Sequence, residues 1–252
     1  MDRTLVVLPV SPWSERARWA LDHHRLPFRT VEHSPFLGER KLRKLVGPTP
    51  TRATVPVLIE GAQRFMSSTE IARHADRIGS GTPLFPAGRD DELNAWIKIA
   101  DDAFDSARVL VTLGLLASPA ALDETLPPAL PRWLRPLLRP VTRYGTRWFA
   151  RKYGLSVDDV AAAEVAGRQV LEVVRAGLAK SGPYLLGTFS YADIVIALLL
   201  QPVRPVQHER YPLGPATREL WTSSSSSAYS DLLEWRDALY ARHRVPSSSS
   251  AA

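Results

Sequence analysis

Cysteine is absent from this 252-residue chain, and its absence removes several kinds of site at once. Disulfides, protein thiolate nucleophiles, cysteine-ligated zinc and iron–sulfur clusters all require it. A chain without disulfides fits the reducing cytoplasm, where we expect the protein to be located. Long apolar runs are also missing, because none approaches the ~20 residues that cross a bilayer. The N-terminus lacks the apolar segment and cleavage site of a secretory signal. We therefore expect no stable membrane insertion.

Motifs for metals, nucleotides and acyl transfer are missing as well. The six histidines show no metal-ligand spacing, so we expect no metal site. The chain contains no dinucleotide-binding glycine motif, phosphate-binding loop, G-x-S-x-G elbow or H-E-x-x-H motif. Hydrophobic residues make up 45% of the chain and charged residues 23%, which is the composition of a globular protein.

The net charge of +6 is unevenly distributed along the chain. Residues 131–152 carry 7 basic and no acidic side chains. Five arginines in this stripe recur every four residues and would share one slowly drifting helix face, with Pro136 and Pro140 expected to break its early part. A solvated face explains such a stripe, and so does a contact with an anionic ligand, a membrane surface or nucleic acid. We expect no nucleic-acid partner, because no helix-turn-helix, zinc-finger or RNA-binding motif accompanies the stripe.

Hydrophobic periodicity changes once along the chain. Up to residue 78, short β-branched runs (4–10, 28–31, 55–60 and 64–66) alternate with helical patterns (15–23 and 67–78) and with a basic segment, 37–45, that is either helical or irregular. In the 15–23 helix, Ala17, Ala20 and Leu21 lie on one side and the charged residues on the other. After residue 90 every pattern is helical (90–117, 132–152, 157–180, 191–201 and 230–243). A stretch rich in glycine and proline, 79–88, separates the two.

The expected fold class is therefore α/β followed by all-α. We place an α/β domain at 1–79, a linker at 80–89, an all-helical domain at 90–245 and a flexible tail at 246–252.

Three short motifs in the α/β part could contribute to a binding or catalytic site. Ser11 reads as the N-cap of a helix that starts at Pro12, and an anion beside this helix start would be stabilised by the helix dipole and by a hydroxyl. A proline at position 56, directly before a strand core, favours a cis Val55–Pro56 bond. Ser67 with Glu70 fits a capping box, which again places free N–H groups and a hydroxyl at a helix start.

A fourth motif, Ser190-Tyr191-Ala192-Asp193, reads as structural. Ser190 and Asp193 form a carboxylate capping box, flanked by a hydrophobic staple from Phe189 to Ile194. Asp193 is therefore interpreted as a cap rather than as a catalytic acid.

In this order and spacing the motifs resemble the glutathione transferase superfamily. The segments that carry the resemblance are SPWSERARWAL, VPVL, the serine pair 67–68, the proline-rich linker and FSYADI. The resemblance implies a thioredoxin-like N-terminal domain, a helical-bundle C-terminal domain, a homodimer and a role in detoxification. Because SPW is most similar to the SPF of plant tau-type enzymes, it also implies a serine-type member.

The resemblance assigns roles to residues of this chain. Ser11 matches the catalytic serine, which donates a hydrogen bond to the glutathione thiolate. Val55 and Pro56 match the pair whose backbone binds the cysteinyl part of glutathione, and Ser68 matches the serine that binds the γ-glutamyl carboxylate. Ser67, which stands where many members carry an acidic residue, is assigned to the same glutathione-binding site.

The remaining assignments concern the two ends of the site. A basic residue for the glycyl carboxylate is expected at Arg40 or Lys41. Trp13, Phe36 and Arg108 are the expected wall of the electrophile pocket.

The resulting hypothesis is an enzyme that uses glutathione as a co-substrate, without a metal, and adds its thiolate to an apolar electrophile. Two alternatives stay open. One is a related glutathione-dependent peroxidase, dehalogenase or isomerase, and the other is a non-catalytic binding or interaction protein on the same fold.

Overall fold

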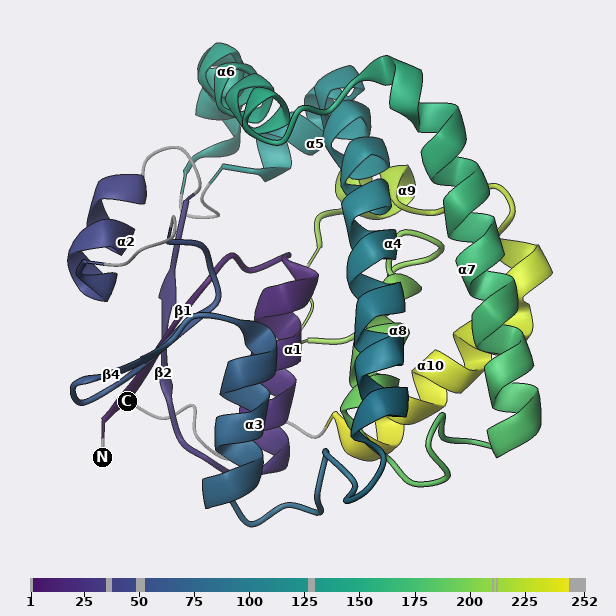
Figure 1. The fold of residues 1–252 in the computed structure, drawn as a ribbon. Helices are drawn as coiled ribbons and strands as arrows, with labels where there is room; N and C mark the ends of the chain where they lie inside the picture. Colours follow the sequence, from purple (N-terminus) through teal and green to yellow (C-terminus); the bar gives the residue numbers. More distant parts are fainter. Residues whose placement is uncertain are drawn as a thin grey trace.

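The structure is a computed structural model that describes residues 2–34, 38–48, 53–126, 130–209, 211 and 213–244. The N-terminal part contains a four-stranded sheet and three helices (Figure 1). The strands are β1 (Arg3–Val7), β2 (Arg29–Glu32), β3 (Val57–Glu60) and β4 (Gln63–Phe65). The helices are α1 (Pro12–His23), α2 (Glu39–Val46) and α3 (Ser68–Ile78).

The sheet has the order β2-β1-β3-β4, in which only the β1–β2 pair is parallel. Successive side chains of a strand point to opposite faces. Leu5 and Val7 of β1 accordingly pack under α1 and α3, while Val6 packs against Leu42 and Val46 of α2. Helices thus cover both faces of the sheet, and the thioredoxin-like prediction is confirmed.

The described residues that follow form a helical domain, which confirms the second half of the predicted fold class. Its central helix, α8, is buried along its whole length and packs against α4, α10 and α1. Together these helices enclose the largest apolar cluster of the structure. The helices are α4 (Asp90–Ala117), α5 (Pro119–Glu124), α6 (Arg135–Lys152), α7 (Val160–Ser181), α8 (Tyr191–Leu199), α9 (Pro215–Leu220) and α10 (Ser230–His243), with 3-10 turns at Arg132–Leu134, Val157–Asp159 and Ser226–Tyr229.

Three local predictions require correction. The strand expected at 4–10 ends at Val7, because Pro9 lacks the N–H that a further ladder bond needs. The expected break at Pro136 and Pro140 does not occur: Pro136 lies in the first turn of α6, where its missing N–H costs nothing, and the helix continues through Pro140. The sequence also places the charges of α1 on an outer face, whereas Glu15 and Arg16 are fully buried between neighbouring elements.

Three further expectations concern the C-terminal tail, membrane-spanning helices and a metal site. The tail expected at 246–252 lies outside the described residues. Among the described residues, none of the helices combines the length and hydropathy needed to cross a bilayer. The same residues contain no group of three or more histidine, aspartate or glutamate side chains placed to share a metal ion.

The side chain of His243, at the end of α10, makes stability depend on pH. Its ring stacks on Phe189 with centroids 3.8 Å apart, and its Nε2 lies 2.9 Å from the Tyr184 hydroxyl. Burial, together with the positive charges of His23 and Arg242, lowers the pKa of His243 to about 4. The pKa of a histidine in the unfolded chain is ~6.5. The packing of the uncharged His243 therefore contributes its full stabilisation above that pH, and this contribution is lost as the pH falls towards 4.

We therefore expect the melting temperature to fall between pH 7 and pH 5, measured by scanning fluorimetry. A His243→Phe variant keeps the ring stack but cannot take up a proton, so its melting temperature should fall less steeply. Equal slopes for the two proteins would contradict this origin of the pH dependence.

Candidate active site

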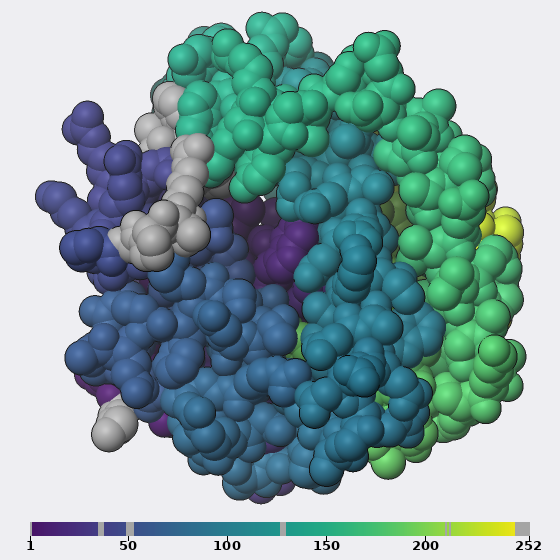
Figure 2. Space-filling model, in the orientation of Figure 1, coloured from purple at the N-terminus to yellow at the C-terminus, as the bar shows by residue number. Residues whose placement is uncertain are grey.

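The register of the sheet brings the three predicted motifs to one edge. Val6 of β1 pairs with Val57 of the antiparallel strand β3. Pro56, which precedes Val57, therefore lies beside the end of β1 that leads to Ser11. Leu58 pairs with Phe65, so Ser67 lies at the same edge, where β4 passes into α3. Figure 2 shows the surface hollowed between this part of the N-terminal domain and α4, with atoms from near the N-terminus at the bottom of the hollow.

Ser11 occupies the N-cap position of α1, as predicted, and Pro12 is the first helical residue. Its backbone closes the first turn, since the Glu15 N–H donates to the Ser11 carbonyl over 3.0 Å. The Ser11 hydroxyl makes no capping hydrogen bond, contrary to the usual behaviour of a serine cap. Instead Ser14 Oγ accepts the Leu8 N–H at 3.1 Å. The Ser11 hydroxyl is therefore not committed to capping α1.

The Val55–Pro56 peptide bond is cis, as predicted from its position before the strand core. Pro56 is buried and Val55 is half-buried, and β3 begins at the next residue, Val57.

Ser67 and Ser68 begin α3 but differ in exposure. Ser67 is the N-cap, is exposed, and accepts the Glu70 N–H at 3.1 Å. The predicted capping box is only half formed, because the Glu70 carboxylate accepts the Met66 N–H at 2.9 Å rather than that of Ser67. Ser68 is the first helical residue and is buried. Of the two serines, Ser68 is thus enclosed at the sheet edge.

A buried arginine lies beside this edge, and the sequence analysis missed its role. The Arg16 side chain of α1 is fully buried, and its Nη1 donates to Asp101 Oδ1 of α4 at 2.6 Å. Nε and Nη2 of Arg16 have no hydrogen-bond partner among the described atoms. The guanidinium also lies 4.9 Å from the centroid of the Phe104 ring. Arg16 therefore retains unused donors in a desolvated place, while its partner Asp101 remains partly exposed.

Tyr191 at the start of α8 completes this buried polar group. Its hydroxyl is fully buried and has no hydrogen-bond partner among the described atoms. Burial raises the pKa of Tyr191, whereas the nearby Arg16 charge and the hydroxyls of Ser68 and Thr69 act to lower it. These interactions place Tyr191, Arg16 and Ser68 in one neighbourhood. Only the three-dimensional structure reveals it, because Tyr191 and Arg16 belong to different domains.

Two of the three residues predicted for the electrophile pocket come together. The guanidinium of Arg108 lies 5.0 Å from the Trp13 ring centroid and 4.4 Å from that of Tyr153. Trp13 also donates from Nε1 to Asp101 at 3.2 Å, and its ring packs against that of Phe104 with centroids 5.3 Å apart. The third, Phe36, lies outside the described residues.

Arg40 and Lys41 are exposed on α2. No contact among the described residues joins either of them to Ser11 or Ser68. The α2 helix is tied to α6 by an ion pair between Glu39 and Lys152, at 3.0 Å and largely buried.

Asp193 has the structural role that the sequence predicts. Its carboxylate accepts the Ser190 N–H at 2.8 Å and the Ser190 hydroxyl at 2.9 Å, and Ser190 in turn caps α8. It also accepts the Leu185 N–H at 2.8 Å. Burial raises the pKa of Asp193 to about 6, although these hydrogen bonds act to lower it. All of its polar contacts are internal to the helical domain.

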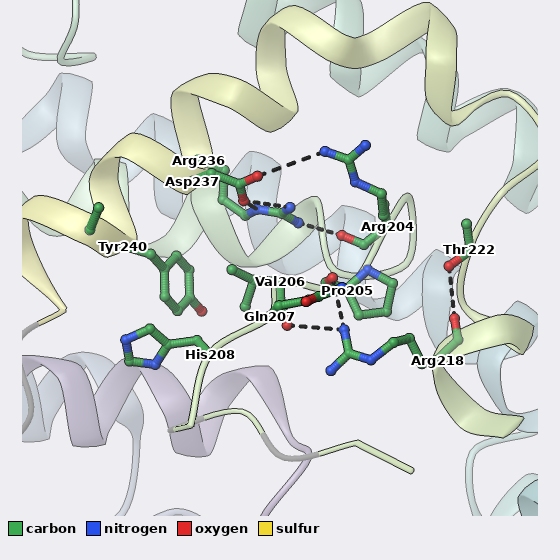
Figure 3. A pocket seen from close by; sticks show the side chains of 11 residues that line it. Arg204, Pro205, Val206, Gln207, His208, Arg218, Thr222, Arg236, Asp237 and Tyr240 are labelled. Atoms are coloured by element: carbon green, nitrogen blue, oxygen red, sulfur yellow. Dashed lines mark hydrogen bonds and ion pairs between the residues drawn. The ribbon is translucent and has the colours of Figure 1, made fainter. Parts of the chain in front are cut away.

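A separate cavity of about 600 Å³ lies between α9, α10 and the loop after α8 (Figure 3). None of the predicted site residues lines it. Two of its arginines hold the loop in place: Arg236 donates to the Leu200 carbonyl at 3.2 Å, and Arg218 to the Pro205 carbonyl at 3.1 Å. These guanidinium groups are therefore engaged in fixing the loop.

Comparison with known proteins agrees with the topology. Residues 5–83 match the family model described as glutathione S-transferase, N-terminal domain. No match to a curated protein sequence was found. Beyond residue 83 the likeness rests on structure.

Solved structures share the fold over nearly the whole chain. A glutathione S-transferase of Methylobacillus flagellatus KT with glutathione bound is 15% identical at a TM-score of 0.61, with 95% of each chain covered. A glutathione S-transferase of Ceriporiopsis subvermispora in complex with glutathione is 19% identical at 0.62, covering 98% of this chain and 99% of the other. The β-etherase LigF of Sphingobium sp. SYK-6 is 19% identical at 0.63, with 96% of each covered. At these identities the likeness establishes the fold.

Proposed function

We propose that the chain is a serine-type, tau-like member of the glutathione transferase superfamily that binds glutathione and uses its thiolate against an apolar electrophile. The observation that carries the proposal is the convergence of Ser11, the cis Val55–Pro56 bond and the buried Ser68 at one edge of the sheet. Under this proposal residues 1–79 bind glutathione, and the helical domain supplies the other wall of the cleft.

Binding would use the two helix starts at this edge. The Ser68 hydroxyl and the N–H groups that begin α3 donate hydrogen bonds to the γ-glutamyl carboxylate. The backbone of Val55 pairs with the cysteinyl residue, and Arg40 or Lys41 attracts the glycyl carboxylate. No acidic residue stands at Ser67, but the partly exposed Asp101 beside Arg16 offers a carboxylate for the γ-glutamyl ammonium.

The energetics of thiolate formation fit the groups at α1. A free thiol has a pKa near ~8.5, and lowering it by ~2 units requires ~2.7 kcal/mol of preferential thiolate stabilisation. A hydrogen bond from the uncommitted Ser11 hydroxyl to a charged sulfur contributes ~1.5–3 kcal/mol. The start of α1 adds ~0.3–1 kcal/mol. Together these two contributions supply the required amount without a metal.

The reaction then consists of sulfur attack on an electrophilic carbon, with a new C–S bond and either a departing leaving group or a protonated adduct. Trp13 and Arg108 would border the electrophile. Redox steps through a protein cysteine are excluded, since the chain has none. In this role we expect a cytoplasmic homodimer that takes part in detoxification.

The first test is calorimetric titration with glutathione. We expect wild-type protein to bind, and a Ser68→Ala variant to bind about 10–100-fold more weakly, because one hydrogen bond to a carboxylate is lost. Ser80→Ala, which removes an exposed hydroxyl beyond α3, is the matched control and should bind like wild type. Absence of heat from the wild type, or equal affinity of the Ser68 variant, would contradict the mapped site.

The strongest rival is a binding protein without turnover, favoured by Ser67 in place of an acidic residue and by the basic stripe on α6. Steady-state assays against several activated halides, epoxides and a peroxide separate the possibilities. Turnover of a halide or epoxide supports the transferase, and turnover of the peroxide alone supports the related glutathione-dependent reaction. Binding without any turnover supports the rival.

A further inference from the structure

The 3-10 turn Arg132–Leu134 and the first half of α6 expose an apolar ridge. The exposed fractions are 74% for Trp133, 69% for Leu137, 51% for Val141 and 54% for Tyr144. Spacings of four and three residues place Leu137, Val141 and Tyr144 on one face of α6, and Trp133 lies four residues before Leu137 in the adjoining 3-10 turn. A monomeric domain rarely leaves such large apolar side chains in contiguous exposure unless the surface meets something.

Cations continue the same face and surround it. Arg147 and Arg151 follow Tyr144 at helical spacing, and both are exposed, as is Arg132 at the other end. None of these three arginines forms an ion pair with a described carboxylate. The segment 131–152 contains no acidic residue to offset them. The ridge therefore lies within a positive surface.

Not every cation of the segment belongs to this surface. Arg139 pairs with Asp123 of α5 over 2.5 Å, and Lys152 pairs with Glu39 of α2. These two ion pairs hold the inner side of α6 against its neighbours. The helix is thus held by α5 and α2, and it lies at the upper end of the molecule in Figures 1 and 2.

We propose that this face of α6 docks onto an anionic lipid surface. Tryptophan, leucine and tyrosine on one face with flanking arginines form the pattern of a helix that lies in the bilayer interface. Arginines near an anionic membrane are attracted to its negative surface potential. The protein binds peripherally, since α6 is anchored to α2 and α5 and does not cross the bilayer.

The chemistry of the face disfavours the other occupants. A second copy of the chain, related by two-fold symmetry, would bring the same cations against each other, and their repulsion opposes the contact. Nucleic acid would use the arginines through its phosphates but gives Leu137 and Val141 no apolar surface to bury. Anionic lipid satisfies both the charges and the ridge.

Docking would also matter for the proposed function, on which this one consequence rests. Because α6 borders the hollow beside α4 in Figure 2, a docked molecule holds the mouth of that hollow near the bilayer, where apolar electrophiles accumulate.

The test is flotation of the full-length protein with vesicles. Phosphatidylcholine vesicles with about 30 mol % phosphatidylglycerol should bind the protein at about 50 mM salt, with loss of binding at about 500 mM. Pure phosphatidylcholine vesicles should bind it at least about 10-fold more weakly. Failure of the wild type to bind the anionic vesicles overturns the proposal, whatever its affinity for glutathione.

Two double variants separate the ridge from the charge. Trp133→Ser with Leu137→Ser, and Arg147→Glu with Arg151→Glu, should each weaken binding by about 10-fold or more. The matched control, Arg168→Glu with Lys180→Glu, makes the same charge change at exposed positions on α7 and should bind within about twofold of wild type. Circular dichroism verifies that the variants are folded.

Three results would overturn the assignment of the surface. Equal loss in the α7 control indicates diffuse attraction by a basic protein. Undiminished binding of both α6 variants places the contact elsewhere. Conversion of a dimer to a monomer by the Trp133/Leu137 variant, seen by size-exclusion chromatography, identifies the ridge as an interface between copies.

Discussion

Replacing Ser11 by alanine is expected to lower the turnover of glutathione conjugation at pH 7 by about 10–100-fold. The variant lacks the one hydroxyl at the start of α1 that makes no capping bond, so the proposed thiolate loses a charge-assisted hydrogen bond worth ~1.5–3 kcal/mol. The pKa of bound glutathione should rise by about 1–2 units. Thiolate absorbance in a pH titration measures this rise, and kcat/KM with an activated aryl halide measures turnover.

Two further variants make the expected result specific to the hydroxyl. Ser11→Thr retains a donor at the same atom position and should recover most of the turnover. Ser80→Ala, which is remote from the sheet edge, should leave it unchanged. If the Ser11→Ala variant keeps both wild-type turnover and the wild-type thiolate pKa, Ser11 is not the thiolate donor, even if glutathione still binds.

The second large effect concerns stability, and it arises where the last helix meets the first. Arg244 is buried, donating to Glu15 at 2.7 Å and to Asp22 at 2.6 Å, with its guanidinium 5.7 Å from the Trp19 ring centroid. Burial by itself would lower the pKa of Arg244, but Glu15 and Asp22 hold it above its ordinary value. Arg244 therefore stays protonated in the folded protein.

An Arg244→Met variant should lose about 3–5 kcal/mol of unfolding free energy, because the buried Asp22 loses its cation and the buried Glu15 keeps only Arg18. Arg242→Met is the matched control: Arg242 is exposed on the same helix, so its loss should cost less than about 1 kcal/mol. Urea denaturation followed by tryptophan fluorescence measures both values.

A variant cycle identifies the cause. In a background of Glu15→Gln and Asp22→Asn, Arg244→Met should cost less than about 1 kcal/mol or should stabilise the fold, because Arg244 is there a buried cation without a carboxylate partner. An unchanged penalty would assign the loss to packing of the arginine on Trp19 instead. If Arg244→Met in the otherwise wild-type protein costs no more than the Arg242→Met control, the ion cluster contributes little to folding.

Several features of the site were predictable because they depend on neighbours in sequence. Proline after a serine predicts the start of α1, and Ser190 with Asp193 predicts the start of α8. Both are observed. The cis bond before β3 was likewise predictable from a proline that interrupts the ladder. In each case the decisive contact spans three residues or fewer.

Local rules failed where a partner outside the segment decided the outcome. The arginine stripe predicted five arginines on one shared helix face, but Arg139 is paired with Asp123 of α5. The pattern of α1 predicted an outer charged face, but Arg16 is covered and paired with Asp101 of α4.

From the sequence alone follow the order of the strands and of the longer helices, the starts of α1 and α8, and the absence of any cysteine chemistry, whereas the short helices α5 and α9 were not predicted. Only the tertiary structure decided which charges are buried and with whom they pair. The physical reason is that a cap is satisfied three residues along the chain, whereas a charge can leave water only where an opposite charge meets it. For Arg16 that charge is 85 residues away, and for Arg244 it is 229 residues away.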